Sequence, residues 1–436
     1  MTKPDRTWLI LSHGFNMDGR AASLTITDKM PYLIQSGIHP VVLSAKTGTQ
    51  DTRFPHDQLW PWGPAGFRFD LRHRLNVLWG KRGWRYRVVT GAVSLLLAPW
   101  ILLERLVAGL QSQWSWTPAA VWHGLRWVRR TSPELVYSTG GAYSAHWAGY
   151  WIKKLTGIPW IAEIHDPMVF PGTVPGTRNL KFWAKLEGMI CSEADLVWWF
   201  TDQALASARR RHPQLGDKGF VVLPGADPPK GSAPYVRGNA LRLGHFGSLS
   251  EVRTLKLFVK GFARFKQAHP DQATHIEVHC YGGSMDRLAK ATIAEHDLGA
   301  HFIEHGRIET DAITGLSGRE RIQQIMHGMD GLLLIHGHTQ DCAEYIPSKV
   351  YDYFWARRPV VALTHLNPQL TDMVRAYNGY AVEIDEDGSV EQLLQQVYDD
   401  WHEGRMLASP RQPLGPDQAV EKVLARVAAT IPGVSR

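Results

Sequence analysis

Two carboxylates, Glu344 and Asp352, flank a Pro-Ser-Lys step that has the features of a helix start. Proline is tolerated in a first helical turn because its missing N–H would have no partner there. The amides of Ser348, Lys349 and Val350 are therefore predicted to point outward, unpaired, as an anion site. Asp352, early in the helix, can accept two hydrogen bonds from a vicinal diol, as acidic residues do with ribose. Glu344 is predicted to contact the far side of the same ligand.

A simpler role for both acids is to complement the dipole of the helix. This explanation suits Asp352, which lies inside the predicted helix. It fits Glu344 poorly, because Glu344 precedes the helix and the proline. The two acids are therefore predicted to have different roles around one ligand.

Three more loops follow apolar segments that are predicted to be strands, and ligands bind at the carboxyl ends of strands in α/β folds. The first loop, SHGFNMDGR, carries Gly14, Asn16 and Gly19. Its backbone can approach a ligand closely and supply amide donors to an acceptor or a phosphate. A plain tight turn would have the same composition.

The second loop, in the sequence IAEIHDPMVF, carries His165 and Asp166. A neighbouring His-Asp pair at the end of a strand suits acid–base work or hydrogen bonding to a polyhydroxylated ligand. The alternative is a structural histidine held by local backbone groups.

The third loop begins at Gly247 and Ser248 and leads into a predicted helix that carries Arg253 and Lys256. Amides at the start of a helix, together with hydroxyls and a cation, form a phosphate site. An ordinary amphipathic helix capped by Ser250 is the alternative.

The elements that position these loops alternate between short apolar runs and helical patterns, which predicts parallel sheets with helices on both faces. A Pro/Gly-rich break at 223–234 separates two such series. The sequence predicts an N-terminal domain at 1–225, a C-terminal domain at 235–412 and a helix within 413–436 that crosses back. The predicted strands are TWLILS (7–12), HPVVLS (39–44), ELVYST (134–139), IPWIAEI (158–164), ADLVWWF (194–200), GFVVLP (219–224), LRLGHF (241–246), HIEVHCY (275–281), GLLLI (331–335), PVVAL (359–363) and GYAVEI (379–384).

Composition limits the class of protein. The 436 residues are 44% hydrophobic and 20% charged, which is typical of a globular chain with more than one core. Three cysteines without metal-type spacing argue against a disulfide framework and against a zinc site. The first residues show no small-residue cleavage site after their short apolar run, so we expect a cytoplasmic protein without an export signal.

The net charge of +7 is concentrated in one segment. Residues 68–130 hold 11 Lys/Arg and 2 Asp/Glu, which leaves the rest of the chain with 37 basic and 39 acidic residues. A local basic excess indicates a surface for an anionic partner.

This basic segment lies in a helical insertion predicted at 67–130. Tryptophans among arginines suit helices at an anionic bilayer surface, with rings at headgroup level. The apolar stretch at 88–103 is shorter than the ~20 residues of a spanning helix, which argues against a transmembrane helix. A helical hairpin packed on its own domain is the alternative. The predicted membrane contacts are Trp84, Arg85, Arg87, Trp100, Trp114 and Trp116.

Together these motifs resemble the family 4 glycosyltransferases, which have the GT-B fold of two Rossmann-like domains facing across a cleft. The segment from Glu344 to Asp352 is similar to that family's paired acids, in the branch written P-S-K-x-Y-E/D-Y. The loops HGFNMDGRAAS, EIHD and FGSLSEVRTLKLF follow in matching order. The resemblance covers nearly the whole chain outside 67–130.

The resemblance implies a retaining transfer from a nucleotide-diphosphate sugar, a UDP-sugar being favoured, without a metal or any other cofactor. It implies that Asp352 binds the ribose, that the 348–350 amides and Arg253 bind the diphosphate, and that Glu344 and His165 contact the sugar. Gly14 and Asp166 would border donor and acceptor. The acceptor would be a lipid-linked sugar or polysaccharide of the cell envelope, reached by peripheral docking on the inner face of the cell membrane.

The chain departs from the family pattern at two site positions. Asp352 stands where Glu is usual, and Gly247-Ser248-Leu249 lacks the arginine of the usual G-R-L, so Arg253 or Lys256 must supply the cation. Two alternatives stay open: a nucleotide-sugar epimerase of the same architecture, and a non-catalytic nucleotide-sugar-binding module attached to a membrane. Nucleic acid is not an expected partner, and the sequence leaves the oligomeric state open.

Overall fold

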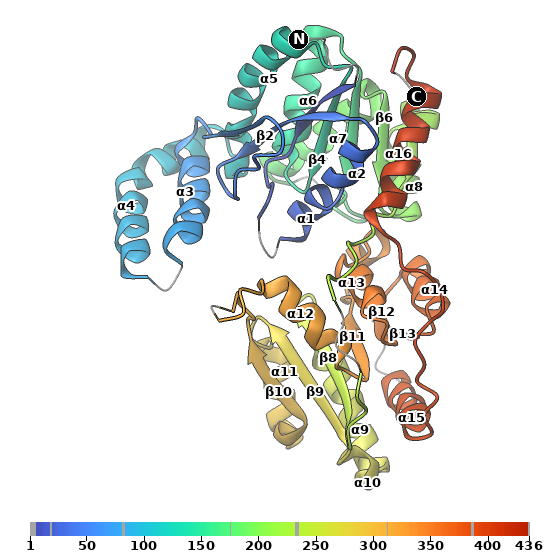
Figure 1. Ribbon diagram of the computed structural model, residues 1–436. Coiled ribbons are helices and arrows are strands. Elements are labelled where there is room, and N and C mark those ends of the chain that lie inside the picture. The colour runs from blue at the N-terminus through green and yellow to red at the C-terminus, as the bar shows by residue number, and fades with distance from the viewer. Residues whose placement is uncertain are drawn as a thin grey trace. The chain divides into compact units, whose positions relative to one another are not determined.

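The computed structural model describes residues 6–17, 20–80, 83–174, 176–231, 235–311, 313–384 and 388–434 (Figure 1). The chain forms two compact units. One contains residues 1–224 together with 416–436, and the other contains residues 225–415. The last helix of the chain therefore belongs to the first unit.

The first unit is built on a seven-stranded parallel sheet in the order β3-β2-β1-β4-β5-β6-β7. The core strands β1, β4 and β5 are completely buried and mostly apolar, as expected for a sheet covered on both faces. Their bounds are β1 (Thr7–Leu11), β2 (His39–Ala45), β3 (His56–Leu59), β4 (Leu135–Gly140), β5 (Trp160–Ile164), β6 (Leu196–Trp199) and β7 (Gly219–Val221).

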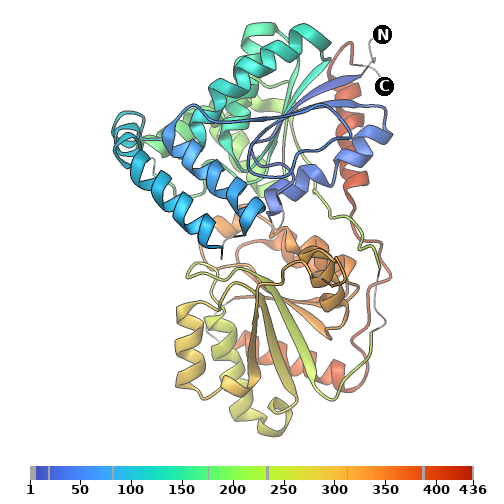
Figure 2. The ribbon, with the colours of Figure 1, turned by 60° about the vertical axis from the view of Figure 1, so that its left-hand side comes forward.

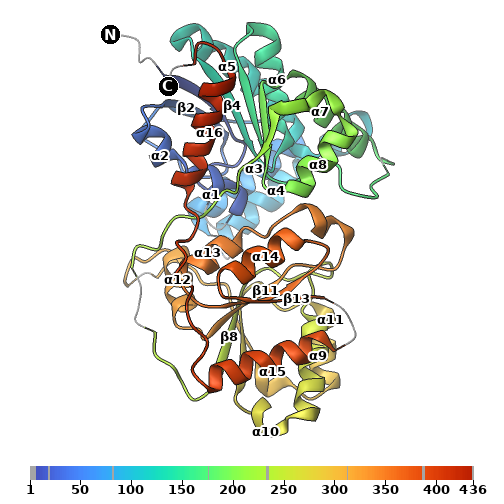
Figure 3. The ribbon, with the colours of Figure 1, turned by 90° about the vertical axis from the view of Figure 1, so that its right-hand side faces the viewer.

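Helices cover both faces of this sheet. One face packs against α1 (Ala21–Thr27), α2 (Met30–Gln35) and the C-terminal α16 (Pro416–Thr430), which lie together in Figure 3. The other face packs against α5 (Thr117–Thr131), α6 (Tyr143–Thr156), α7 (Arg178–Glu193) and α8 (Asp202–Arg211). A short 3-10 helix, η2 (Pro213–Lys218), precedes β7.

The segment predicted as an insertion has two parts that differ in environment. Helix α5 packs on the sheet, because its Ala119 and Ala120 are buried in the same core cluster as the strand residues Leu9 and Leu43. The remainder is a hairpin of α3 (Pro64–Trp79) and α4 (Trp84–Val107) followed by η1 (Ser112–Trp116). Figures 1 and 2 show α3 and α4 side by side, away from the sheet. The insertion predicted at 67–130 is therefore too long, since α5 belongs to the layer that covers the sheet.

Helix α4 is continuous through Gly91 and Pro99. Its 24 residues are long and apolar enough to cross a membrane by length and composition, and only 11% of its most apolar stretch is buried. The helix is thus longer than the uncharged stretch at 88–103, on whose length the argument against a transmembrane helix depended.

Two of the tryptophans predicted to contact a membrane are placed otherwise. Trp116 is completely buried, and Trp114 is partly buried against the core with its indole N–H donating to Glu104. Trp84 and Trp100 are 70% and 61% exposed on α4.

The second unit has a six-stranded parallel sheet in the order β10-β9-β8-β11-β12-β13. One face packs against α9, α11 and α15, as Figure 3 shows for α9 and α15. The bounds are β8 (Leu241–Gly247), α9 (Lys256–Ala268), α10 (Pro270–Ala273), β9 (Ile276–Gly282), α11 (Arg287–Glu295), η3 (Gly299–His301), β10 (Phe302–Gly306), α12 (Gly318–His327), β11 (Gly331–Ile335), η4 (Gln340–Glu344), α13 (Lys349–Trp355), β12 (Val360–Thr364), α14 (Pro368–Ala376), β13 (Tyr380–Glu383) and α15 (Ser389–His402).

Candidate functional site

Both sheets have a topological switch point, where the strand order reverses. In the first unit β1 and β4 are neighbours, and in the second unit β8 and β11 are neighbours. Ligands of open α/β sheets bind outside the carboxyl ends of the strands at such a point. The predicted site residues fall into two groups, one in each unit, on the loops that follow these strands and β5.

In the first unit, Glu163 at the end of β5 is the centre of a buried polar network. Its carboxylate accepts hydrogen bonds from the Lys29 ammonium and from the hydroxyls of Tyr137 and Thr139. Burial raises the pKa of Glu163, but the Lys29 ammonium and His165 outweigh this effect and hold that pKa well below its usual range. Glu163 is therefore a buried, charged acceptor.

This network orients His165, one of the predicted catalytic residues. His165 Nε2 lies 3.1 Å from Thr139 Oγ1, whose hydroxyl donates to Glu163. The threonine oxygen then accepts from the ring, which assigns the proton of a neutral imidazole to Nε2 and leaves Nδ1 as the acceptor. The ring also packs on Phe200, with centroids 5.0 Å apart. The structure thus supports an oriented histidine that can accept a proton from a ligand.

Asp166 is exposed and lines a cavity of about 190 Å³ at the carboxyl ends of β4 and β5. Gly140, Tyr143, Phe170 and Trp183 form much of the rest of its wall. His146 also lines it, and burial lowers the pKa of His146 to about 4, so this imidazole is neutral. An aromatic wall with one carboxylate suits a ligand that is partly apolar and carries hydroxyl groups.

The glycine loop of the first unit differs from its prediction. The Asn16 amide donates to Thr27 Oγ1 at 3.3 Å, and the Met17 amide donates to Ser23 Oγ at 2.8 Å. These two amides are therefore used within the fold, and Gly14 is the part of the loop left for close approach. Gly19 lies outside the described residues.

A histidine that the sequence analysis passed over lies at the same edge. His13, directly after β1, is 3.3 Å from the buried carboxylate of Asp70 on α3 and packs edge-on to Trp116. Asp70 and Trp116 come from the segment predicted as an insertion, so only the fold brings them to this loop. The pair connects the α3–α4 hairpin to the loop that carries Gly14.

In the second unit, β8 ends at Gly247, whose φ of +121° is a conformation that side chains rarely adopt. The loop after it differs from its prediction. Ser250 and Arg253 pair with each other in a tight turn, and α9 begins only at Lys256 after the N-cap Leu255. Ser250 is therefore not a helix cap, and Gly247 and Ser248 are not at the start of a helix.

The loop from β11 to α13, which carries Glu344, is held by several polar contacts. Asn367 donates to the carbonyls of Cys342 and Tyr345, and His336 contacts the Tyr345 carbonyl at 3.0 Å. Burial lowers the pKa of His336 to about 4, so it is a neutral donor. Glu344 itself is 1% exposed. The Glu344 side chain is therefore buried in a loop whose backbone is held by side-chain hydrogen bonds.

The start of α13 only partly matches the prediction. Ser348 is the N-cap and Pro347 precedes it, outside the helix. The Val350 amide donates to the Pro347 carbonyl at 3.0 Å, so it is not an unpaired donor. Asp352 lies 3.6 Å from Arg319 of α12, a partner that the sequence analysis did not identify. Of the three predicted amide donors, those of Ser348 and Lys349 remain candidates for binding an anion.

The side chain of Lys349 is a further difference, because the sequence analysis used only its amide. Its ammonium nitrogen is buried and has no hydrogen-bond partner. A Cβ placed on Gly247 would lie 3.1 Å from this nitrogen. Two residues predicted separately for donor binding, Gly247 and Lys349, are thus in direct contact.

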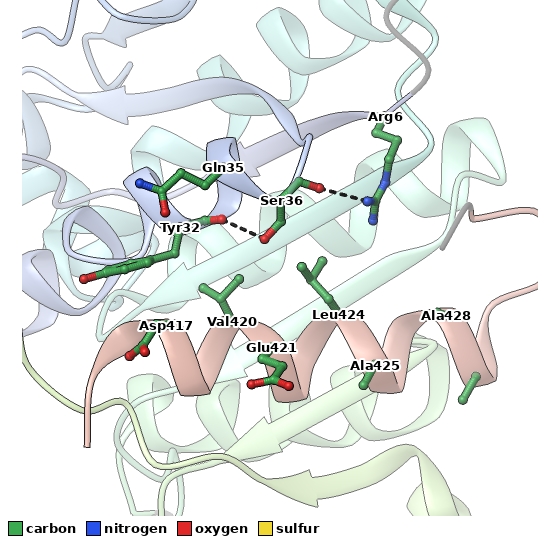
Figure 4. A pocket seen from close by; sticks show the side chains of 11 residues that line it. Arg6, Tyr32, Gln35, Ser36, Asp417, Val420, Glu421, Leu424, Ala425 and Ala428 are labelled. Carbon is green, nitrogen blue, oxygen red and sulfur yellow. Dashed lines mark hydrogen bonds between the residues drawn. The ribbon is translucent and has the colours of Figure 1, made fainter. Parts of the chain in front are cut away.

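Another cavity of the first unit lies away from the group around His165. It measures about 650 Å³ and lies between α2 and α16 (Figure 4). Arg6 and Ser36 in its wall precede β1 and β2, so it opens at the amino ends of the strands. None of the predicted site residues lines it. Among the described residues, no cluster of three or more His, Cys, Asp or Glu side chains could hold a metal ion.

The sequence matches no protein-family model and no curated protein sequence. Solved structures do share its fold. Sucrose-phosphate synthase from Thermosynechococcus elongatus has a TM-score of 0.62 at 13% identity, over 96% of this chain and 94% of that chain. TarM has a TM-score of 0.57 at 10% identity, over 98% and 96%. A UDP-N-acetylglucosamine 2-epimerase has a TM-score of 0.50 at 12% identity, over 97% and 95%.

At these identities the similarity establishes the fold alone. The predicted α/β class with two Rossmann-like domains of the GT-B type is confirmed. Membership of family 4 remains an expectation from the sequence motif.

Proposed function

We propose that this protein is a GT-B glycosyltransferase that moves a sugar from a nucleotide-diphosphate sugar to an acceptor. The observation that carries the proposal is the switch point of the second sheet. There the braced carboxylate of Glu344 and the diol acceptor Asp352 accompany a glycine turn and two cations, Arg253 and Lys349. A carboxylate can bind the ribose of a nucleotide sugar and cations can bind its phosphates, while a glycine lets the backbone come close to the same ligand.

Within this proposal the residues of the second unit divide the donor among them. Asp352 binds the ribose diol, with Arg319 orienting its carboxylate, and the Ser348 and Lys349 amides bind phosphate. Glu344 contacts the transferred sugar. The departing diphosphate gains its stabilisation from fixed cations and amides, as in a metal-independent retaining transfer of the family 4 type. A UDP-sugar is the favoured donor.

His165 and Asp166 of the first unit act on the sugar and acceptor side. The oriented Nδ1 of His165 accepts a hydrogen bond from a sugar hydroxyl. The aromatic cavity beside Asp166 binds the acceptor, for which a lipid-linked sugar or an envelope polysaccharide is the favoured class. Gly14 borders the acceptor.

The α3–α4 hairpin is proposed to dock the enzyme on the inner face of the cell membrane. The polar contacts of α4 with α3 and η1, made by Ser94 and Glu104, face inward. Its outward residues are apolar, including Leu95 and Leu96 at 77% and 73% exposure, while Arg85 is exposed near its start. An apolar face with arginines at its end suits an anionic bilayer surface.

A nucleotide-release screen across UDP-, GDP- and ADP-sugars, with membrane extract as acceptor source, tests this function. We expect release to require both one nucleotide sugar and the extract. Glu344→Gln and Asp352→Asn should each lower kcat/KM about 100-fold or more, since they remove fixed polar contacts to the reacting substrate. Glu295→Gln, an exposed acid of α11, is the charge-matched control. Full turnover in both site variants would refute the site assignment.

A nucleotide-sugar epimerase is the second candidate, supported by the similarity of fold to a UDP-N-acetylglucosamine 2-epimerase. An epimerase needs no acceptor. Conversion of the sugar in purified protein without extract would favour it. Tight nucleotide binding with no reaction in either assay would favour a non-catalytic binding module.

A further inference from the structure

The cavity between α2 and α16 is a groove with helical walls, here called the α2–α16 groove (Figure 4). Its volume is about 650 Å³, and its lining includes Tyr32 from α2 and Val420, Leu424 and Ala428 from α16. Tyr32, Val420 and Leu424 also pack against the hydrophobic core, which supports the floor of the groove. Helices associate when a row of side chains on one helix fits a groove on the other surface. The shape of this groove therefore suits a helix.

Helix α16 presents such a row of side chains beside its own groove. Residues four positions apart on a helix form a continuous ridge. Because two of the ridge residues are alanines, the ridge is low and another helix can come close to it. One helix thus carries both a wall of the groove and a ridge of the kind that fits it. The ridge consists of four exposed residues, Asp417, Glu421, Ala425 and Ala429.

The two ends of the groove carry opposite charges. Asp417 and Glu421 lie in the first two turns of α16. Arg6 lies at the other end, above Leu424 and Ala428 in Figure 4. A partner that complements both ends must present a cation opposite the acids and a carboxylate opposite Arg6. A second copy of the same surface, turned end to end, presents these charges in that order.

The charged groups at both ends are accessible to a partner. Asp417 and Glu421 are exposed, and Arg6 is partly exposed. Arg6 donates from Nη1 to the Ser36 carbonyl, 3.0 Å away, and its Nε lies 3.9 Å from Glu134. A guanidinium has five N–H groups, so Arg6 keeps donors for a further carboxylate.

We propose that the α2–α16 groove is the interface of a homodimer, in which α16 of each copy lies antiparallel in the groove of the other. A two-fold axis near Ala425 brings Glu421 of each copy close to the partner's Arg6. The same surface is used by both copies, so the assembly closes as a dimer. This inference goes beyond the proposed function and does not rest on it, because none of the predicted site residues lines the groove.

Disulfide cross-linking tests the contact near the axis. The three native cysteines are all buried, so a cysteine introduced at an exposed position is accessible where they are not. We expect Ala425→Cys to form a covalent dimer on mild oxidation, because a residue near a two-fold axis approaches its own copy. Ala291→Cys, at an exposed alanine of α11, is the matched control and should remain a monomer on a denaturing gel. Equal cross-linking of the two variants would overturn the arrangement.

Analytical ultracentrifugation of the full chain, from about 1 to about 100 µM, measures the dissociation constant of the dimer. Ala425→Trp raises the ridge and should increase this constant at least about tenfold. Ala291→Trp, the matched control, should stay within about twofold of wild type. Both positions are exposed, so both variants should keep the melting temperature of wild type. A monomeric Ala425→Trp that melts normally has therefore lost association and not the fold.

A charge reversal tests the pairing at the ends of the groove. Glu421→Arg places like charges together, so we expect the dissociation constant to rise about tenfold or more. Glu295→Arg, at an exposed acid of α11, should change it by no more than about twofold. The difference between the two variants should shrink at about 0.5 M salt, where exposed charges are screened.

The remaining outcomes decide against the interface. Wild type that stays monomeric up to about 100 µM would overturn it. A dimer that forms equally well in Ala425→Trp and Glu421→Arg would overturn it as well. If Trp84→Ser/Trp100→Ser abolishes the dimer and these two variants do not, the copies associate through the α3–α4 hairpin instead.

Discussion

Glu163 and Lys29 form an ion pair that the fold has removed from water. Both side chains are almost completely buried, at 0% and 3% exposure, and Glu163 also accepts from two hydroxyls. A buried pair of this kind contributes little net stability compared with apolar residues, but removal of one partner leaves an unpaired charge. The pair is best explained as the support of His165.

We expect Lys29→Met to cost about 3–5 kcal/mol of unfolding free energy, since it isolates the Glu163 carboxylate. The double variant Lys29→Met/Glu163→Leu should recover much of this loss. Urea denaturation of the single and double variants measures the coupling. Equal losses in the two would mean that the pair is not a unit.

The depressed pKa of Glu163 predicts a pH dependence of stability. A carboxyl group whose folded pKa is below its unfolded value stabilises the fold above the unfolded pKa, and that contribution is lost as the pH falls. The unfolding free energy of wild type should therefore decline below about pH 4.5 more steeply than that of Glu163→Gln. Parallel curves from urea titrations at pH 3 to 7 would contradict this role.

Thr139 is a positioning residue, because its hydroxyl connects Glu163 to His165. Thr139→Val keeps the shape and removes the link, so we expect turnover to fall about tenfold and its pH profile to shift. Thr139→Ser restores the hydroxyl and should restore both. A loss of turnover in both variants, with an unchanged pH profile, would indicate packing alone.

At the scale of elements, sequence prediction worked best where a strand is buried on both sides. The two strands it missed, β3 and β10, are both edge strands. Each has one neighbour and carries polar residues, such as Asp57 and Glu304, so neither shows a continuous apolar run. Helix α5 was assigned to the insertion because its sequence sets tryptophans among arginines. In the structure Trp122 is exposed, while small residues such as Ala119 and Ala120 are buried.

Prediction of the candidate site from the sequence was likewise incomplete. Residues adjacent in sequence, such as His165 and Asp166, were found together because one loop carries them. Contacts between distant segments were not predicted. An example is the ion pair of Lys29 and Glu163, which are 134 positions apart. The side chain of Lys349 was missed for the same reason, because only the sheet order places α13 against Gly247.

The α3–α4 hairpin gives a prediction for membrane binding. Trp84→Ser/Trp100→Ser should reduce co-sedimentation with vesicles of phosphatidylglycerol and phosphatidylcholine about tenfold, since two exposed rings are lost from the interface. Trp122→Ser on α5 is the matched control, as Trp122 is 53% exposed outside the hairpin. Binding that is equal in all three proteins, or insensitive to salt, would argue against this surface.

At the scale of the whole molecule, α16 completes the first unit although it follows the second in sequence. Val423 and Val427 are 4% and 1% exposed against a core that includes Trp8 and Ile10. Val427→Asp buries a charge there and should cost about 3 kcal/mol or more. Limited proteolysis should then cleave the first unit faster and leave 225–415 intact, whereas equal cleavage of both units would contradict the assignment.

This arrangement of α16 also determines the order in which the chain can fold during synthesis. The second unit is continuous and is complete once residue 415 has left the ribosome. The first unit begins earlier, but the apolar face of its sheet that α16 covers stays open until residues 416–430 are made. Chains interrupted between residue 415 and α16 would therefore present a folded second unit attached to an incomplete first one, which makes the nascent first unit the part most in need of a chaperone.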